Sequence, residues 1–403
     1  MFNFERFFKY VKIDTTSDQN NENKPSSLNQ LNLAKVLVED LKELGLNNIC
    51  LENNGNVYAT YVGSKDYKTI ALVAHIDTSC DAKGSDIKPR IINNYDGNDI
   101  KLNNHNTIRI SDFPFLEEHK NHDLIVTDGT TLLGADDKAG ICIIFDVLEY
   151  IIKNNIKTGN IKVAFTTDEE VGMGAKDFNY DYFKDCDFAL TLDGDNVSNI
   201  EYETFNAASV KVDITGRSTH PGSAKNKMIN AISLAMQFNS MLDPMMVPEK
   251  TDNYEGFNHL HNICGTVENT SMEYIIRNHD TNLFNLQKQN FIKIKDYINQ
   301  IYNQELVKLT MVDQYYNMAN EVLKRKDILE LIEYAIVKVG LKPKYVPIRG
   351  GTDGATLSKN GLICPNIGTG GRNYHSRYEF LDLFEANKAI EIVLNIIEGL
   401  KYE

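Results

Sequence analysis

Three short apolar segments, each followed at once by acidic or histidine residues, constrain the fold of this chain more than any other feature of its sequence. They span residues 69–74, 161–165 and 188–192, and an apolar run of helical length at 141–152 lies between the first two. Strands that alternate with helices form a largely parallel sheet. Ligands collect at the carboxyl ends of the strands in such sheets, so we expect the polar residues after these segments to meet at one edge.

The second segment is followed by a pair of adjacent acidic residues, Glu169 and Glu170, and Gly172 comes soon after them. Adjacent carboxylates point in different directions, so one of them can bind a metal while the other moves protons. A Glu-Glu pair is more often a solvated feature of the surface. Its place at the end of an apolar strand is what makes this pair a candidate for function.

Similar residues follow the first segment, where His75 and Asp77 end the predicted strand. Residues two apart on a strand share a face, so the carboxylate of Asp77 can hold the imidazole of His75 in one tautomer. Zinc sites use this arrangement around their histidine ligands. A histidine with a purely structural role at a strand end would give the same pattern.

Three further candidates complete a set of ligand-type residues. Asp136, followed by Asp137, precedes the apolar helical run, where either carboxylate could instead cap the helix by accepting its free N–H groups. Asp193 ends the third apolar segment, and His375 lies in a polar loop before the last helix. Two histidines and three or more carboxylates at the strand ends of one sheet form the ligand set of a two-metal hydrolase.

Several of these motifs resemble the peptidase T family of two-zinc aminopeptidases, which remove the N-terminal residue from tripeptides. The resemblance extends nearly from end to end of the chain. Its most specific parts are His75–Ser79, Leu133–Gly140, Thr167–Gly172, Ser218–Gly222, Tyr254–Phe257, Arg349–Ala355, and His375 with the downstream Tyr378–Phe380.

The resemblance implies two Zn²⁺ ions per chain and a role for each ligand-type residue. Asp136 would bridge both ions. His75 and Asp193 would complete the first metal site, and Glu170 and His375 the second. All five positions hold the residue type that the family requires.

The resemblance also implies the catalytic residues. Glu169 would be the general base, Asp77 the partner of His75, and His220 a lid histidine that swings over the metals to stabilise the oxyanion. The implied reaction is hydrolysis of the first peptide bond of a short peptide by a hydroxide held between the two zinc ions. The family geometry further implies a cis peptide bond between Asp136 and Asp137.

Two positions depart from the family pattern, although neither is a ligand position. Cys80 stands where the family often has proline, and Asp195 stands where it has a small residue. Asp195 would add negative charge near the metals and alter metal affinity or the substrate charge that is accepted. Cys80 has no evident histidine partner, which argues against a nucleophilic role.

The order of the predicted elements divides this α/β chain into two domains. A doubly wound mixed sheet would form the catalytic domain, residues 1–207 and 318–403. Residues 208–317 would form an inserted ferredoxin-like α+β lid domain with β-α-β-β-α-β order. The strands of that domain are expected near 209–215, 271–277 and 306–312, and its helices near 224–241 and 282–297.

Bulk composition excludes several classes of partner. The net charge of −14 argues against nucleic acid, whose binding relies on clustered Lys and Arg. No segment approaches the ~18 apolar residues that are needed to span a bilayer. Six cysteines without C-x-x-C spacing indicate reduced thiols rather than a disulfide framework. We therefore expect a cytoplasmic protein with no membrane and no nucleic-acid partner.

Five other histidines are expected at the surface. His259 and His261 have metal-like spacing, but the five ligands already named suffice for two ions. His105, His119 and His122 fall in a polar, Asn-rich insertion between the first and second apolar segments.

Two arginines are candidates for binding the C-terminal carboxylate, which an enzyme limited to tripeptides must recognise at a fixed distance from the metals. Arginine clamps a carboxylate with two parallel hydrogen bonds. Arg277 ends a predicted strand of the lid domain, and Arg349 opens a glycine-rich loop that would leave room for a ligand. A surface ion pair is the alternative for either residue.

Other functions fit parts of the pattern. Two-zinc dipeptidases and N-acyl amino acid deacylases use the same ligand set, although Tyr254 and the loop that begins at Arg349 favour a tripeptidase. A non-enzymatic metal or amino-acid binding protein would be expected to lack the base, yet Glu169 is present. If the carboxylates served only as helix caps, the match of seven positions to the family pattern would be a coincidence. The expected partner is a short peptide, and a homodimer through the lid domain is left open.

Overall fold

The chain folds into two units, which a computed structural model describes over residues 1–401. Unit 1 contains residues 1–202, 318–346 and the residues from 352 onward, and unit 2 contains residues 203–317 and 347–351. The sequence predicts boundaries at 207/208 and 317/318. The short segment 347–351 therefore returns to unit 2 after the chain has re-entered unit 1.

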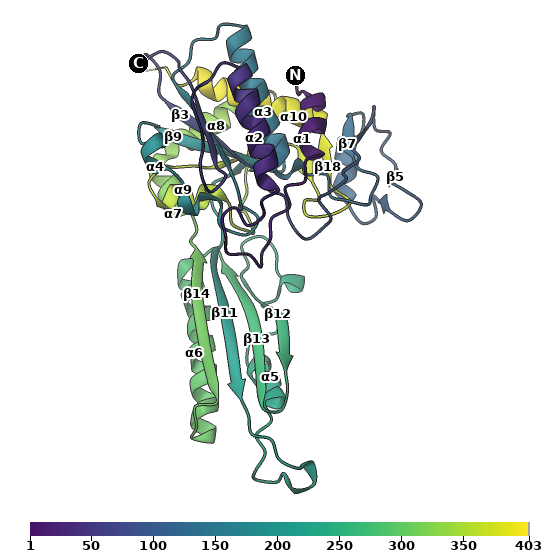
Figure 1. Cartoon of the computed structure of the whole chain (residues 1–403), viewed down its shortest axis with the longest axis vertical. Helices are drawn as coiled ribbons and strands as arrows, with labels where there is room; N and C mark the ends of the chain where they lie inside the picture. The colour runs from purple at the N-terminus through teal and green to yellow at the C-terminus, as the bar shows by residue number, and fades with distance from the viewer. Residues whose placement is uncertain (402–403) are drawn as a thin grey trace. The chain divides into compact units, whose positions relative to one another are not determined.

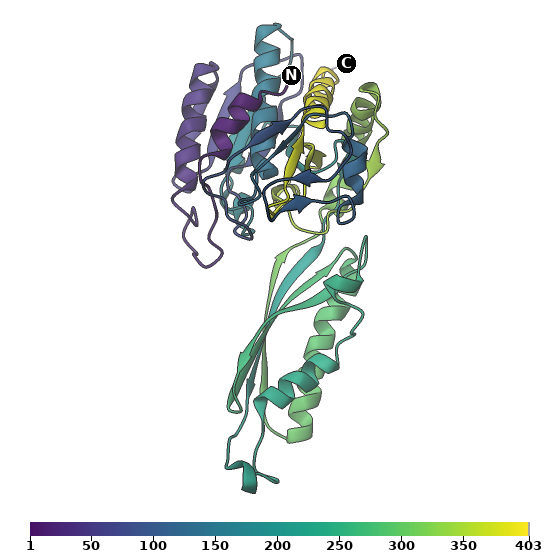
Figure 2. The ribbon, with the colours of Figure 1, turned by 90° about the vertical axis from the view of Figure 1, so that its right-hand side faces the viewer.

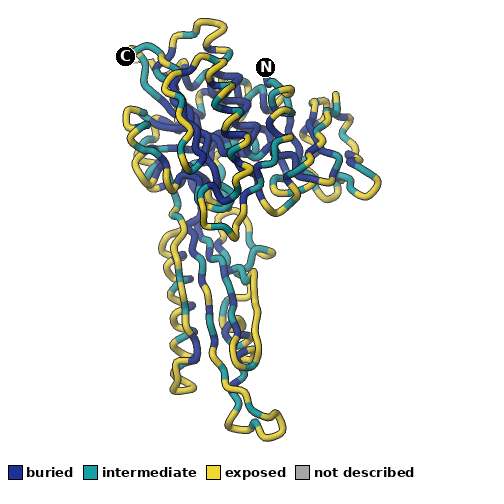
Figure 3. Tube along the Cα trace, viewed as in Figure 1, coloured by how far each residue is buried: buried dark blue, intermediate teal, exposed yellow. Residues whose placement is uncertain are grey.

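The central sheet of unit 1 has eight strands in the order β1-β2-β8-β3-β9-β16-β10-β15. β3 pairs in parallel with both β8 and β9, whereas β1 and β2 add antiparallel strands at one side, so the sheet is mixed as predicted. The inner strands β3 and β8 are buried along their whole length (Figure 3), which suits their largely apolar sequences, whereas the edge strands β1 and β15 are mostly exposed. Their bounds are β1 (Asn47–Leu51), β2 (Val57–Tyr61), β3 (Ile70–His75), β8 (Ile161–Thr166), β9 (Phe188–Gly194), β10 (Asn199–Glu201), β15 (Lys344–Tyr345) and β16 (Asn366–Gly368).

Helices cover both faces of this sheet. α3 contacts β3 and β9 on one face and also packs on α1 and α10, while α10 in turn packs on α8. On the other face, Ala71 and Val73 of β3 pack against a cluster that includes Phe183 and Leu357, so α4 and α9 lie on that side (Figure 1). The helices of unit 1 are α1 (Phe4–Val11), α2 (Gln30–Glu43), α3 (Ala135–Lys153), α4 (Tyr180–Phe183), α7 (Ala319–Val322), α8 (Lys326–Lys338), α9 (Asp353–Lys359) and α10 (Leu383–Glu398).

A smaller sheet of unit 1 joins the polar insertion to the C-terminal part of the chain. Its strand order is β17-β18-β7-β4, and β18 pairs with β7, so that Phe380 lies opposite Val126. A hairpin of β5 and β6 lies beyond it in the same insertion (Figure 1). The bounds are β4 (Arg90–Ile92), β5 (Ile100–Lys101), β6 (Thr107–Ile108), β7 (Leu124–Val126), β17 (Gly371–Arg372) and β18 (Phe380–Asp382).

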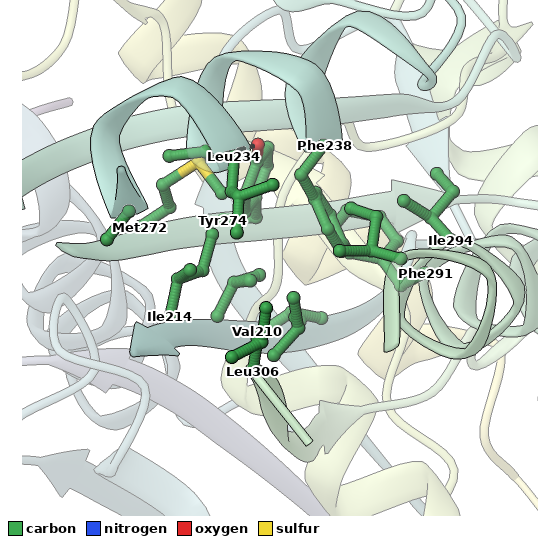
Figure 4. Packing of buried hydrophobic residues seen from close by; sticks show 14 of the residues in the cluster. Val210, Ile214, Leu234, Phe238, Met272, Tyr274, Phe291, Ile294 and Leu306 are labelled. Atoms are coloured by element: carbon green, nitrogen blue, oxygen red, sulfur yellow. Dashed lines mark hydrogen bonds between the residues drawn. The ribbon is translucent and has the colours of Figure 1, made fainter. Parts of the chain in front are cut away.

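Unit 2 has the predicted β-α-β-β-α-β order. Its antiparallel sheet runs β12-β13-β11-β14, and α5 and α6 lie on one face of it (Figure 2). The core lies between the two layers and contains Val210, Phe238, Tyr274 and Phe291 (Figure 4). The bounds are β11 (Asn206–Thr215), α5 (Ala231–Ser240), β12 (Phe257–Gly265), β13 (Asn269–Asn278), α6 (Thr281–Tyr302) and β14 (Val307–Tyr315).

One helix of unit 2 begins later than predicted. The sequence predicts a helix from 224, but α5 begins at Ala231. The side chain of Asn230 accepts hydrogen bonds from the backbone N–H groups of Ile232 and Ser233, which fixes the N-terminus there. Within residues 1–401, every helix is too short or too polar to cross a membrane.

Candidate metal centre

The ligand-type residues come together at the carboxyl ends of three neighbouring strands. His75 is the last residue of β3, Glu170 follows β8, and Asp193 lies near the end of β9. Asp136 lies in the first turn of α3, and His375 lies in the loop between β17 and β18. This is the edge at which a parallel sheet was expected to collect its ligands.

Asp136 lies between two groups of ligand atoms. Its Oδ1 is 2.8 Å from Nε2 of His75, which in turn is 3.6 Å from Oδ1 of Asp193. Its Oδ2 is 3.3 Å from Nε2 of His375, which is 2.8 Å from Oε2 of Glu170. The two oxygens of one carboxylate thus face two separate donor groups, as a bridging ligand requires.

Burial and mutual repulsion make this cluster suitable for cations. Burial, followed by the charge of Asp136, raises the pKa of Glu170 to about 7, and burial also raises the pKa of Asp193. Oε1 of Glu170 is buried and has no hydrogen-bond partner among residues 1–401. An orphaned carboxylate oxygen beside two imidazoles fits a bound divalent ion, which would satisfy that oxygen and offset the repulsion.

Asp77 contacts both His75 and the loop that carries Glu169 and Glu170. Nδ1 of His75 is 3.0 Å from the backbone carbonyl oxygen of Asp77 and 3.5 Å from its carboxylate. The carboxylate accepts hydrogen bonds from the backbone N–H groups of Glu169 and Glu170, at 3.0 and 3.1 Å. Asp77 therefore orients the imidazole mainly through its main chain, and its side chain holds the loop that carries the acidic pair.

Glu169 lies beside the ligands without belonging to either donor group. Burial, followed by the charge of Asp193, raises the pKa of Glu169 well above its ordinary value. Asp168, immediately before it, has φ of 64° and turns the chain at the end of β8. The side chain of Asp168 is held by Ser26 and Gln30, so this turn is anchored in the rest of unit 1.

The two adjacent aspartates at the start of α3 have different roles. Asp136 faces the histidines, whereas the carboxylate of Asp137 accepts hydrogen bonds from the N–H groups of His75 and Gly140. The capping interpretation is therefore right for Asp137. The peptide bond between the two residues is cis, which confirms the prediction from the family resemblance.

Sequence reasoning missed several residues that hold the centre in place. Glu379 is buried, and its carboxylate accepts hydrogen bonds from the N–H groups of Leu133, Gly134 and Asp136 at 2.6–3.2 Å. The sequence offers one signal for this role. Glu379 directly precedes the apolar strand β18, and a glutamate that is buried there needs hydrogen-bond donors. Three other residues act similarly: Asp353 accepts from Thr166 and Ala175, Thr352 lies 3.3 Å from Asp193, and Asp81 lies 3.2 Å from Nδ1 of His375.

The predicted residues of unit 2 lie at its opposite ends. His220 is exposed and follows β11, whereas the chain enters the unit at the start of that strand. At about 3.3 Å per residue, the strand alone spans roughly 33 Å. Arg277 and Arg349 lie at the entry end, since Arg277 pairs with Ala207 and both residues neighbour Phe257.

The two arginines are engaged within unit 2. Arg349 donates hydrogen bonds to the backbone carbonyl oxygens of Thr251, Asn253 and Glu255, and its guanidinium lies 5.1 Å from the ring centre of Phe205. Arg277 is half-buried, donates to the carbonyl oxygen of Ile276 and lies over the ring of Tyr315. Arg349 thus organises the loop 251–255 as well as lying near the entry of the unit.

The remaining candidates differ in their surroundings. Cys80 is exposed, and all six cysteines, which lie within the described residues, are free thiols. His105 lies at the surface as predicted. The prediction for His119 is wrong, because its side chain is only 2% exposed and bonds to Asp382.

A mixed α/β sheet that gathers buried histidines and carboxylates at its strand ends, with an inserted β-α-β-β-α-β unit, defines a metal-dependent hydrolase. A family model for peptidase family M20/M25/M40 matches residues 117–399. A curated peptidase T from Caldanaerobacter subterraneus subsp. tengcongensis is 49% identical over 399 residues, 98% of this chain and 97% of that protein. The chain therefore belongs to the peptidase T family within peptidase family M20/M25/M40, and it is a metallo-aminopeptidase.

Solved structures share the fold. Aminopeptidase PepT from Bacillus cereus superposes with a TM-score of 0.78 at 23% identity, and all of both chains is covered. A tripeptidase from Staphylococcus aureus superposes with a TM-score of 0.79 at 21% identity, again over all of both chains. At these identities the likeness shows the fold.

Proposed function

We propose that this enzyme removes the N-terminal residue from tripeptides with two zinc ions and Glu169 as general base. The observation that carries the proposal is the position of Asp136, whose two carboxylate oxygens face His75 and Asp193 on one side and His375 and Glu170 on the other. Imidazole and carboxylate donors suit zinc. The peptidase T relative and the tripeptidase of the same fold support the substrate class.

Each residue would then have a defined task. His75, Asp136, Asp193, Glu170 and His375 would hold two ions, whose Lewis acidity would polarise the scissile carbonyl and lower the pKa of water. Glu169 takes a proton from water and returns it to the leaving amine, and the raised pKa of its carboxyl group suits both transfers. Asp77 would hold the base at a fixed position relative to the ligand Glu170, because its carboxylate accepts hydrogen bonds from the N–H groups of Glu169 and Glu170.

We also propose that a second copy of the chain supplies His220 in a homodimer formed through unit 2. The support is the position of His220 beyond the far end of β11, about one strand length from the connections to unit 1. An exposed imidazole delivered in this way would stabilise the oxyanion of the transition state.

Mixing two inactive variants tests this arrangement. His220→Ala lacks the oxyanion donor and Glu169→Gln lacks the base, so each should be nearly inactive alone. In a mixed dimer, one site combines an intact Glu169 with His220 of the other copy, and activity should return after subunit exchange. Mixed preparations that exchange subunits, shown by affinity-tag capture, but stay inactive would contradict the proposal.

The C-terminal carboxylate of the substrate is proposed to bind at the entry end of unit 2. Arg277 and Arg349 both lie there, and Arg349 would act in part by shaping the loop 251–255. A guanidinium pairs well with a carboxylate but poorly with an amide. This would let the enzyme measure peptide length from the metals to the carboxylate.

A peptide panel tests the substrate class, and arginine variants then test the clamp. The parent enzyme should cleave tripeptides in preference to di- and tetrapeptides and should prefer a tripeptide acid to its amide. Arg277→Ala and Arg349→Ala should lower kcat/KM for the acid about tenfold or more and narrow the acid-to-amide preference, with metal content unchanged. Arg277→Lys is the matched control, because lysine keeps the positive charge but cannot form the two parallel hydrogen bonds of a guanidinium. If both alanine variants keep the parent preference, the clamp lies elsewhere.

We propose a cytoplasmic location on the basis of the thiols. Cys50, Cys80 and Cys264 are exposed and free. Exposed free thiols are typical of proteins in reducing compartments. Fractionation of the source cells, with detection by antibody, would test this, and recovery outside the cytoplasm would refute it.

A further inference from the structure

A second cluster of ligand-type side chains lies in unit 1 and takes no part in the chemistry proposed above. It consists of His119, His122 and Asp382. His119 ends the 3₁₀ turn Pro114–His119, His122 precedes β7, and Asp382 ends β18 and caps α10. Nδ1 of each histidine lies 2.6 Å from the same oxygen, Oδ2 of Asp382.

The surrounding structure fixes these three groups. His119 is packed edge-on against Phe380 at 5.1 Å between ring centres, and His122 stacks on Phe384 at 4.5 Å. Oδ1 of Asp382 accepts hydrogen bonds from the N–H groups of Phe384 and Glu385, which directs Oδ2 at the histidines. The side chain of His122 is 25% exposed, so the cluster is open to solvent on one side.

The charges of the cluster favour a cation. Oδ2 of Asp382 has two imidazole nitrogens 2.6 Å away, so the cluster brings a carboxylate and two nitrogen donors to one point. The neighbouring Glu385 lies 3.7 Å from Nδ1 of His119, but Arg372 binds both of its oxygens at 2.8–2.9 Å.

We propose that His119, His122 and Asp382 form an additional zinc site, separate from the catalytic centre, with water as the fourth ligand. Two imidazoles and a carboxylate are a donor set that zinc takes in proteins. Asp382 offers Oδ2, which faces the two histidines, while its Oδ1 is held by the N–H groups of Phe384 and Glu385. The two histidines are three residues apart in one compact turn, so one ion can reach both.

The change in geometry that binding needs is small. Ligand atoms about 2.1 Å from a tetrahedral ion lie roughly 3.4 Å apart. The nitrogen-to-oxygen distances of 2.6 Å in this cluster would therefore have to widen by less than ~1 Å. In the candidate metal centre, the corresponding distances are 2.8–3.6 Å. His122, which lies outside helices and strands and is partly exposed, is the residue that can move.

An ion bound here would tie the polar insertion to the C-terminal part of unit 1. His119 and His122 belong to the insertion, whereas Asp382 joins β18 to α10. The site would therefore act on stability, and it does not require the catalytic ions. Its test can be made in protein whose catalytic centre has been disabled.

Zinc content should distinguish the site from a simple hydrogen-bonded triad. Asp136→Ala and the double variant Asp136→Ala/His122→Asn would each be loaded with Zn²⁺ alone, desalted, and measured by mass spectrometry of the metal. Asparagine keeps an N–H donor close to the position of Nδ1 but is a poor zinc ligand. The first variant should hold one more ion per chain than the second. Equal zinc content in the two variants would overturn the proposal, whatever the catalytic centre retains.

A second measurement covers the case in which the double variant folds poorly. Zinc titration of the parent and of His122→Asn, in competition with a coloured chelator, should show one more bound ion in the parent. Zinc should also raise the Tm of Asp136→Ala and leave the Tm of the double variant unchanged. Equal stoichiometry in the titration, or equal zinc-induced shifts, would mean that the histidines serve only as hydrogen-bond donors to Asp382.

Discussion

Replacing Asp136 with alanine should remove two metal ions from the enzyme at once and abolish peptide hydrolysis. Its two oxygens lie 2.8 Å and 3.3 Å from the imidazoles of His75 and His375, so both donor groups lose a ligand together. The loss of both ions also removes the polarisation of the carbonyl and of water, which accounts for most of the expected rate loss. Metal analysis and a tripeptide assay on the same preparation would measure both effects.

Asp193→Ala is the matched comparison for this variant. Asp193 lies 3.6 Å from His75 and belongs to one donor group only. Its removal should therefore weaken the binding of one ion and leave the binding of the other unchanged. Chelation of the parent should likewise abolish activity, and added zinc should restore it. An Asp136→Ala variant that keeps the metal content of the parent would show that Asp136 does not bridge.

Changing Glu169 to glutamine should leave metal binding intact and lower kcat by ~10² to 10⁴ or more, the range for loss of a general base. The substitution preserves the size of the side chain and removes only its capacity to carry a proton. Its neighbour supplies the control. Glu170 lies 2.8 Å from His375, so Glu170→Gln should weaken metal binding instead.

The contrast between the two variants separates the base from the ligand. Metal content and kcat would be measured for each, with zinc in excess and after its removal. Near-normal turnover in Glu169→Gln would assign proton transfer to another residue. Loss of metal from Glu169→Gln, with retention in Glu170→Gln, would reverse the two assignments.

The sequence predicts the ligand-type residues at the edge of the sheet well, because each of them lies next to its strand in the sequence. Each apolar strand is followed directly by its polar residue, so strand prediction and site prediction depend on the same few positions. His75, Glu170 and Asp193 are placed in this way, at the ends of β3, β8 and β9. His375 depends on the family resemblance, since nothing near it in the sequence links it to those strands.

Residues whose partners lie far away in the sequence could not be predicted. His119 lies in a polar, Asn-rich insertion, which predicts a position at the surface. It is buried because its partner Asp382, more than 250 positions later, lies in a strand that pairs with β7. Glu379 is similar, since its acceptor role depends on the N–H groups of a loop near Gly134.

Local ambiguity limits prediction elsewhere. Asp136 and Asp137 have the same side chain and adjacent positions, and the sequence left ligand and cap as alternatives for both. The backbone between them directs one carboxylate to the histidines and the other to the N–H group of Gly140. Arg349 is predicted to begin a glycine-rich loop and to bind the substrate carboxylate. Its guanidinium also binds three carbonyl oxygens of the same unit, which the sequence does not indicate.

The return of residues 347–351 to unit 2 bears on how such a domain can be exchanged between proteins. Ile348 donates to the carbonyl oxygen of Glu203, His279 lies 3.0 Å from the carbonyl oxygen of Ile348, and Arg349 binds the loop 251–255. Unit 2 transplanted as the single stretch 203–317 would lose all of these bonds. Recombination that preserves the fold must therefore transfer two separate stretches of the gene together, one for residues 203–317 and one for the loop 347–351.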